Sequence, residues 1–140
     1  MTDAQLREFL TSRPARTAKL ATTHADGRPH VAPVWYAVDD DGSLLLTTGA
    51  RTVKGRNLRR DPRVALCVDD DRPPFSFVSI QGTAILDEDV GRMRPWAEII
   101  GGRYMGEDNA EAYGARNAVP GELLVRIRPE RVMAQKDIAG

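Results

Sequence analysis

The segment from Leu45 to Leu58 combines side chains that bind phosphate esters. Thr47 and Thr48 end a predicted strand with two hydroxyls, and Thr52 follows a glycine turn as the predicted N-cap of a helix. A helix N-terminus leaves backbone N–H groups unpaired and carries partial positive charge, so it stabilises an anion. The hydroxyls and N–H groups of this segment therefore predict an anion site where the strand meets the helix.

Cationic residues surround the same predicted helix start. Arg51 precedes the cap, and Lys54 lies three residues before Asn57, a spacing that favours a common helix face. A guanidinium or ammonium makes charge-assisted bonds to phosphate. The alternative interpretation is a solvated charged face, and spacing alone leaves both open. Three further arginines of this region fit that plainer interpretation: Arg59, Arg60 and Arg63.

The remaining reactive residue types do not form a catalytic set. His24 and His30 are six residues apart without a carboxylate or cysteine pattern beside them, so we predict no metal site. His30 could contact a cofactor or substrate, or could be a satisfied histidine at a strand start. Cys67 lies between Leu66 and Val68, which predicts a buried thiol. We assign no catalytic residue from the sequence.

The composition limits the class of protein. The chain has 140 residues, of which 41% are hydrophobic and 29% are charged, so we expect one folded domain spanning 1–140. Twenty Lys and Arg balance twenty Asp and Glu, which argues against a nucleic-acid partner. No apolar run reaches the ~18 residues of a membrane span, so we expect no membrane partner. Charged residues near the start argue against a signal peptide and favour a cytoplasmic location.

Six strands and flanking helices are predicted around these residues. Period-two patterns bounded by turn signals predict strands, and Asp61-Pro62 ends a helix that starts at Val53. Tight turns between strands favour a mainly β, six-stranded antiparallel barrel over a parallel sheet. The second strand is apolar on both faces, which predicts cover by a ligand or a second copy. The expected strands are 17–23, 30–38, 43–48, 63–68, 75–86 and 122–127, and the expected helices lie near the N-terminus and at 53–60, 89–104 and 109–116.

Three segments resemble a known family. The chain contains, in the family's order and spacing, the segments ADGRPHVAPVWY, TTGARTVKGRNLRRDPRVALCVDD and PFSFVSIQGTAIL. They resemble the pyridoxamine-phosphate-oxidase-like split β-barrel family, and within it the branch that uses the deazaflavin coenzyme F420. The likeness runs from about Arg16 to Val132. It implies a homodimer with two cofactor sites at the subunit interface.

The resemblance also implies individual site residues. It implies that four residues face the cofactor phosphate: Lys54, Asn57, Thr47 and Thr48. Along the isoalloxazine-like ring it places His30, Ala32, Pro33, Val34 and Trp35. It also implies that the other subunit contributes Phe75, Ser76 and Phe77 to the ring and phosphate of the cofactor. Some relatives carry an arginine two residues before the lysine; Thr52 stands there in this chain, so Arg51 either reaches the phosphate or that contact is missing.

We therefore expect an F420-dependent oxidoreductase that transfers a hydride between the coenzyme and a small organic substrate. Such a cofactor supplies the chemistry while the protein binds and orients it. One alternative is an FMN-binding oxidoreductase on the same barrel, and another is a non-catalytic binding protein for F420 or another phosphate ester. Pyridoxamine-phosphate oxidation is not expected, because the chain ends at Gly140 without the tail that grips that substrate. The polyglutamate tail of F420 could lie along Arg56, Arg59 and Arg60.

Overall fold

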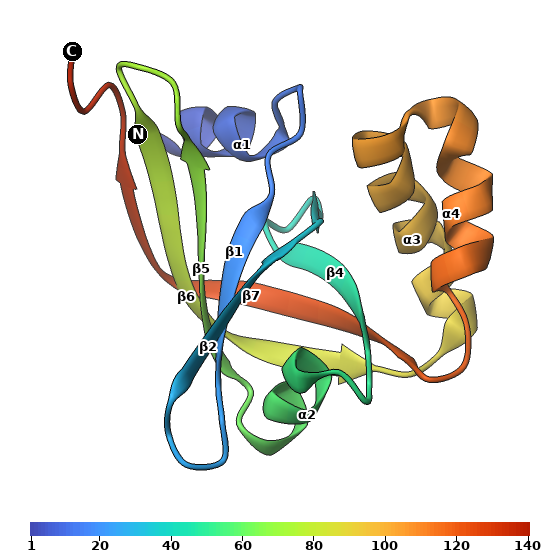
Figure 1. The fold of residues 1–140 in the computed structure, drawn as a ribbon. Helices are drawn as coiled ribbons and strands as arrows, with labels where there is room; N and C mark the ends of the chain where they lie inside the picture. The colour runs from blue at the N-terminus through green and yellow to red at the C-terminus, as the bar shows by residue number, and fades with distance from the viewer.

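The computed structural model describes residues 1–140, which form one curled antiparallel sheet with helices around it (Figure 1). The sheet has seven strands, not the six expected, in the order β2-β1-β5-β6-β7-β4-β3. The extra strand arises because the predicted strand 30–38 divides into two. The strands are β1 (Ala18–Thr23), β2 (Pro29–Val34), β3 (Ala37–Val38), β4 (Leu44–Gly49), β5 (Arg63–Asp70), β6 (Ser76–Asp87) and β7 (Glu122–Gln135).

The residues Trp35 and Tyr36, which separate β2 from β3, connect one edge of the sheet to the other. β2 pairs with β1 at one edge and β3 pairs with β4 at the other. Between them, the backbone N–H of Tyr36 donates to Tyr104 Oη at 3.2 Å, and Tyr36 Oη donates to the Leu10 carbonyl at 2.6 Å. These side-chain partners replace ladder bonds, which satisfies the buried polar groups where the chain crosses from edge to edge.

Two short helices begin at side-chain caps, and the second also has the bounds that the sequence predicts. α1 (Asp3–Thr11) starts at a capping box between Thr2 and Gln5. α2 (Val53–Arg60) starts at Thr52 and stops at Asp61, the residue before a proline. Local hydrogen-bonding groups fix both boundaries, so no tertiary information was needed to place them.

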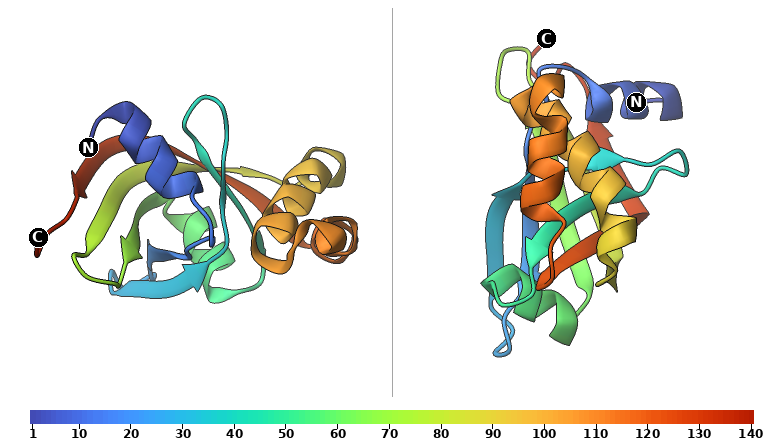
Figure 2. Two further views of the ribbon diagram at one scale, coloured as in Figure 1. Left: turned by 90° about the horizontal axis from the view of Figure 1, so that it is seen from above. Right: turned by 90° about the vertical axis from the view of Figure 1, so that its right-hand side faces the viewer.

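A helical hairpin covers one end of the sheet, as Figure 2 shows in two further views. It consists of α3 (Val90–Met105), a 3-10 turn η1 (Glu107–Asn109) and α4 (Ala110–Asn117), and α3 continues through Pro95. A small core cluster joins α3 and the segment after α4 to β4 and β7, namely Leu45, Met93, Ala97, Ala118 and Leu124. No helix is long and apolar enough to cross a membrane.

The last strand is longer than predicted, and the pairing of β6 with β7 is irregular at Gly82. β7 continues past residue 127 to Gln135 along β6, with a register shift between Gln81 and Gly82. A β-carbon at Gly82 would lie 2.4 Å from the carbonyl oxygen of Arg128, so only glycine fits this close approach. The main core fills the inside of the curled sheet and contains Leu20, Tyr36, Leu46, Ile80 and Ile127 among others.

One face of β2 stays open in the single chain. Val34 is buried, whereas Val31 is 66% exposed and Pro33 is exposed on the other face. The cover expected from the two apolar faces of this strand is thus present on one side only within this chain. The homodimer remains a prediction.

Candidate functional site

A cavity of about 360 Å³ lies where β2, β4, α2 and the helical hairpin meet. Six of the residues predicted for the site line it: Pro33, Val34, Trp35, Thr47, Thr48 and Lys54. The structure thus brings residues of the predicted phosphate group and of the predicted ring group to one place. Four more residues that the sequence did not single out complete the lining: Thr17, Ile100, Asn117 and Glu122.

Lys54 reaches this cavity because α2 docks tightly onto the turn after β4. Thr52 Oγ1 accepts from the Gly55 N–H at 3.1 Å and donates to the Gly49 carbonyl at 2.7 Å. A β-carbon at Gly55 would lie 2.2 Å from that same carbonyl oxygen. The cap and the glycine together hold the first turn of α2, and with it Lys54, against the end of β4.

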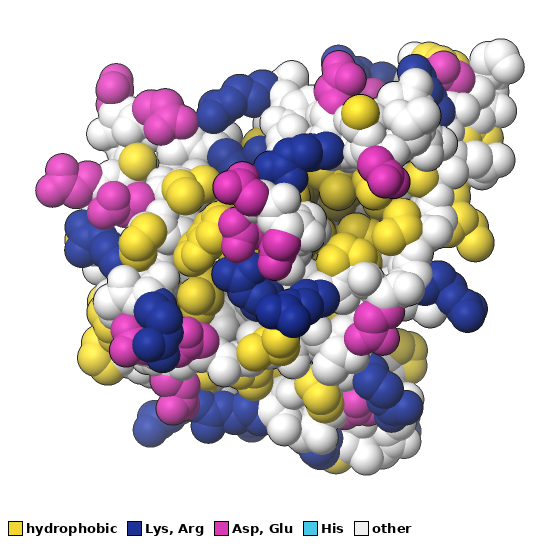
Figure 3. All heavy atoms as spheres, turned by 180° about the vertical axis from the view of Figure 1, so that it is seen from behind, with side chains coloured by type: hydrophobic (Ala, Val, Ile, Leu, Met, Phe, Trp, Pro, Cys, Tyr) yellow, Lys and Arg dark blue, Asp and Glu magenta, His cyan; other side chains and the backbone are white.

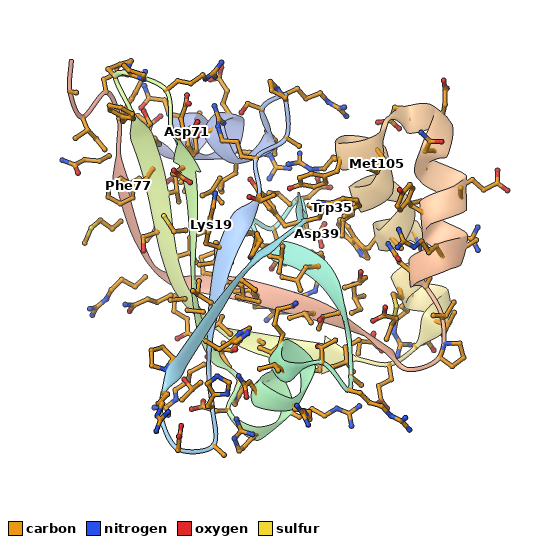
Figure 4. The ribbon with its side chains drawn as sticks, in the orientation of Figure 1. Lys19, Trp35, Asp39, Asp71, Phe77 and Met105 are labelled. Carbon is orange, nitrogen blue, oxygen red and sulfur yellow. The ribbon has the colours of Figure 1, made fainter.

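Trp35 forms the aromatic wall of the cavity. Its ring stacks on that of Tyr104 with centroids 5.1 Å apart and planes 4° from parallel. Tyr113 of α4 approaches from another side, at 5.9 Å between ring centroids. Tyr104 is fixed in turn, because its Oη donates to the Arg16 carbonyl at 2.7 Å. Figure 4 shows the labelled Trp35 beside the helical hairpin, where one face of its ring is already occupied.

Glu122 is the lining residue with the clearest chemical significance that sequence reasoning missed. It is the first residue of β7 and pairs with Gly49 at the end of β4. Its Oε2 is buried and has no hydrogen-bond partner. Burial raises the pKa of this carboxyl, and Lys54 opposes the rise. No local signal identified Glu122, since its place in the cavity follows from pairing of strands far apart in the sequence.

Asn57 and Arg51 lie outside the cavity lining. Asn57 is buried beneath α2, where its Nδ2 donates to Thr22 Oγ1 at 3.1 Å and its Oδ1 accepts from Arg60 at 2.7 Å. The Nδ2 bond fastens α2 to β1, and the Oδ1 bond lies within α2, so both ends of the amide are used inside the protein. Arg51 is exposed at the turn before the helix. In the single chain, Lys54 is thus the one cation in the cavity wall.

His30 and Ala32 lie on β2 beyond the cavity. The His30 ring meets that of His24 edge-on at 5.4 Å between centroids, and its Nδ1 is buried without a partner. Both histidines belong to the β1–β2 hairpin. Ala32 is half-buried on the same strand. Neither residue contributes to the cavity lining of this chain.

The predicted residues Phe75, Ser76 and Phe77 lie at a different part of the molecule. Figure 4 labels Phe77 on β6, across the sheet from Trp35. Ser76 Oγ accepts from the backbone N–H of Asp137 at 3.1 Å and lines a second cavity, of about 240 Å³, beside α1. Within one chain these residues and Lys54 do not meet.

The arginines predicted to lie along the coenzyme tail differ in whether their side chains already bind other groups of the protein. Arg60 donates to the Thr23 carbonyl at 2.8 Å as well as to Asn57, and Arg59 is paired with Glu88. Arg56 is exposed on the outer face of α2. Figure 3, a view from behind, shows Lys and Arg side chains interspersed with Asp and Glu rather than gathered by sign on that face.

Cys67, predicted to be a buried thiol, is only partly buried on β5. Burial, with a further contribution from Asp69, raises the pKa of its thiol. A raised pKa lowers the thiolate fraction at neutral pH, and the thiolate is the reactive form. The expectation that Cys67 is not a nucleophile agrees with this environment.

The curled sheet, the edge-joining pair Trp35-Tyr36 and the cavity at the end of β4 define a split β-barrel protein. A family model described as Pyridoxamine 5'-phosphate oxidase matches residues 2–136. The chain belongs to this family.

Several proteins resemble the chain beyond the family match. A conserved hypothetical protein of Mycobacterium tuberculosis, Rv2991, is 32% identical with a TM-score of 0.85, covering 98% of this chain and 86% of that one. A structure described as an F420 reductase is 28% identical with a TM-score of 0.68, covering 90% and 94%. The 5a,11a-dehydrotetracycline/5a,11a-dehydrooxytetracycline reductase of Streptomyces rimosus is 38% identical over 73 residues, covering 47% of this chain and 51% of the reductase.

Proposed function

We propose that the protein is an F420-dependent oxidoreductase that acts on a small organic substrate. The observation that carries this proposal is the meeting of Lys54, Thr47, Thr48 and Trp35 around one cavity. The family match and the likeness to an F420 reductase support the same reaction class. The partial match to a reductase from Streptomyces rimosus supports reduction of an organic substrate.

The residues present fit the phosphate end of such a cofactor. Lys54 offers an ammonium and Thr47 offers a hydroxyl on the neighbouring strand, whereas the Thr48 hydroxyl lies 3.3 Å from that of Thr52. The buried unpartnered oxygen of Glu122 in the same wall needs a hydrogen-bond donor, which the hydroxylated chain beside the phosphate would supply. The aromatic wall at Trp35 suits a planar ring system at the other end of the cavity.

A bound deazaflavin supplies the hydride chemistry, and the residues of this chain bind and orient it. Lys54 would fix the phosphate and so set how deeply the ring enters. Trp35, held flat by Tyr104, would support one side of the ring system. Ile100 of α3 adds apolar surface to the wall and helps exclude water from it.

We also infer that the site is shared between two copies of the chain. The open face of β2 carries Val31 and Pro33, which a second copy would cover. Phe75, Ser76 and Phe77, which lie away from Lys54 in one chain, would then reach the cofactor of the partner. Light scattering at micromolar protein concentration tests this inference, and a mass near that of one 15.4 kDa chain would contradict it.

The central test is the binding of F420 and of FMN, titrated in parallel against the wild type and Lys54→Ala. Loss of a charged hydrogen bond costs about 1.5–3 kcal/mol, so we expect the Kd for F420 to rise about 10- to 100-fold in the variant. Arg56→Ala is the matched control, because Arg56 is an exposed cation on the same helix. Oxidation of reduced F420 against a panel of electron acceptors then tests turnover.

Each outcome separates the candidates. Tight binding of FMN without binding of F420 would favour the FMN alternative. Tight binding of F420 without turnover of any acceptor would favour a binding protein. An unchanged Kd in Lys54→Ala would remove the basis of the proposal.

A further inference from the structure

The carboxyl of Glu122 is a buried acceptor that the fold leaves without a partner. Its Oε2 is inaccessible to solvent and bonds to no group of the chain. Buried polar atoms are satisfied in nearly all native structures, so the unpartnered oxygen of this cavity-lining residue has bonding capacity for a donor from a ligand.

Lys54 does not satisfy this oxygen, although both residues line the same cavity. If the carboxyl served only to neutralise the lysine, the two groups would be expected to form a direct ion pair. Instead both residues line the cavity without a salt bridge between them. A ligand complementary to both must bring an acceptor or anion to Lys54 and a hydrogen-bond donor to Glu122.

A phosphate ester of a polyol meets both requirements. Its phosphate is an anion, and its hydroxyls are donors that lie a few bonds away. A fully ionised alkyl phosphate offers only acceptors, so it leaves the carboxyl of Glu122 unpaired and meets repulsion when that group is ionised. The threonines and Asn117 in the wall add further partners for hydroxyl groups.

Resting on the proposed function, we propose that Glu122 binds a hydroxyl of the cofactor's ribityl chain and thereby selects phosphate esters that carry a hydroxylated chain. Lys54 supplies affinity for the phosphate, whereas Glu122 distinguishes what is attached to it. A site that binds a substrate hydroxyl through a buried polar group rejects analogues that lack the hydroxyl, because its own group is then left unpaired.

The test measures Kd by calorimetry for F420, ribitol 5-phosphate and propyl phosphate. The variants are Glu122→Met, which removes the carboxyl at similar length, and Glu122→Gln, which keeps a neutral acceptor. The control is Glu111→Gln, an exposed carboxylate on α4. Thermal melting of each variant shows whether it is folded, and Glu122→Gln serves as the test if Glu122→Met is not.

We expect Glu122→Met to weaken binding of F420 and of ribitol 5-phosphate about 10-fold or more, as for loss of a hydrogen bond to a charged group. Binding of propyl phosphate should stay the same or tighten, while Glu122→Gln falls between. Glu111→Gln should match the wild type for all three ligands. If Glu122→Met changed the Kd for ribitol 5-phosphate and for propyl phosphate by the same factor, the proposal that Glu122 selects hydroxylated chains would be wrong.

The outcomes separate this inference from the proposed function. If wild type and both Glu122 variants bind F420 equally, the role of Glu122 is wrong and the proposed cofactor stands. If the wild type binds ribitol 5-phosphate in a Glu122-dependent way but does not bind F420, the cofactor is wrong and the role of Glu122 stands. If the wild type binds none of the three ligands, both are wrong.

Discussion

The two ends of the cavity are built in different ways. At the phosphate end, Thr47, Thr48 and Lys54 lie within eight successive residues, on a strand, a turn and the helix that follows. At the aromatic end, Trp35 packs against Tyr104 and Tyr113, which follow the first six strands in the sequence. The first end is specified by local capping and turn chemistry, whereas the second exists only in the assembled tertiary structure.

The two ends of the cavity should therefore differ in what a substitution changes, which is cofactor affinity at one end and folding stability at the other. Side chains at the phosphate end have bonding capacity left over for a ligand, as the unpartnered oxygen of Glu122 shows. Side chains at the aromatic end use their polar groups within the protein, as Tyr104 does with both Arg16 and Tyr36. Changes at the phosphate end should therefore weaken binding more than folding, and changes at the aromatic end should do the reverse.

The largest effect is expected from Gly55→Ala, which breaks the docking of the phosphate end. The new β-carbon would lie 2.2 Å from the Gly49 carbonyl oxygen, so α2 must move away from the end of β4. Forced overpacking costs about 1–3 kcal/mol, and we expect a lower melting temperature together with loss of most F420 affinity. Calorimetry and thermal melting measure the two losses. A variant that retains wild-type affinity would show that Lys54 does not depend on this docking.

Tyr104→Phe tests the aromatic end without removing the ring. The backbone N–H of Tyr36 and the carbonyl of Arg16 both lose a partner, and a buried group left unpaired costs about 1–3 kcal/mol. We expect a melting temperature several degrees lower and a Kd for F420 within about threefold of wild type in the folded protein. A large loss of F420 affinity at an unchanged melting temperature would contradict the prediction that the aromatic end serves mainly stability. Tyr113→Phe is the control, since it keeps its ring beside Trp35.

Thr52→Ala tests the cap of α2 and should have the smallest effect. Loss of an N-cap side chain costs about 1 kcal/mol, and the first turn of α2 loses its bond to the Gly49 carbonyl as well. We expect a modest fall in melting temperature and a rise of a few-fold in the Kd for F420. Thr52→Ser keeps the hydroxyl and should restore both values. Identical behaviour of the alanine and serine variants would mean that the cap does not position Lys54.

Several features of the site could be predicted because their causes are local. The bounds of α2 follow from Thr52 at one end and Asp61-Pro62 at the other, and the structure confirms both. Asn57 shows where local reasoning stops. Its spacing from Lys54 predicts a shared face, but a rotation of about 60° around the helix is enough to turn Asn57 inward to Thr22.

The sequence by itself determined the family, the antiparallel strands, the cap of α2 and the placing of threonines and a lysine around one turn. Each of these depends on neighbouring residues or on motifs that lie in continuous segments. Only the tertiary structure decided that β2 and β3 separate at Trp35-Tyr36, and that Glu122 pairs with Gly49 and so enters the cavity. Strand register and edge pairing couple residues far apart in the chain, and side-chain period alone does not choose among the partners that a strand could take.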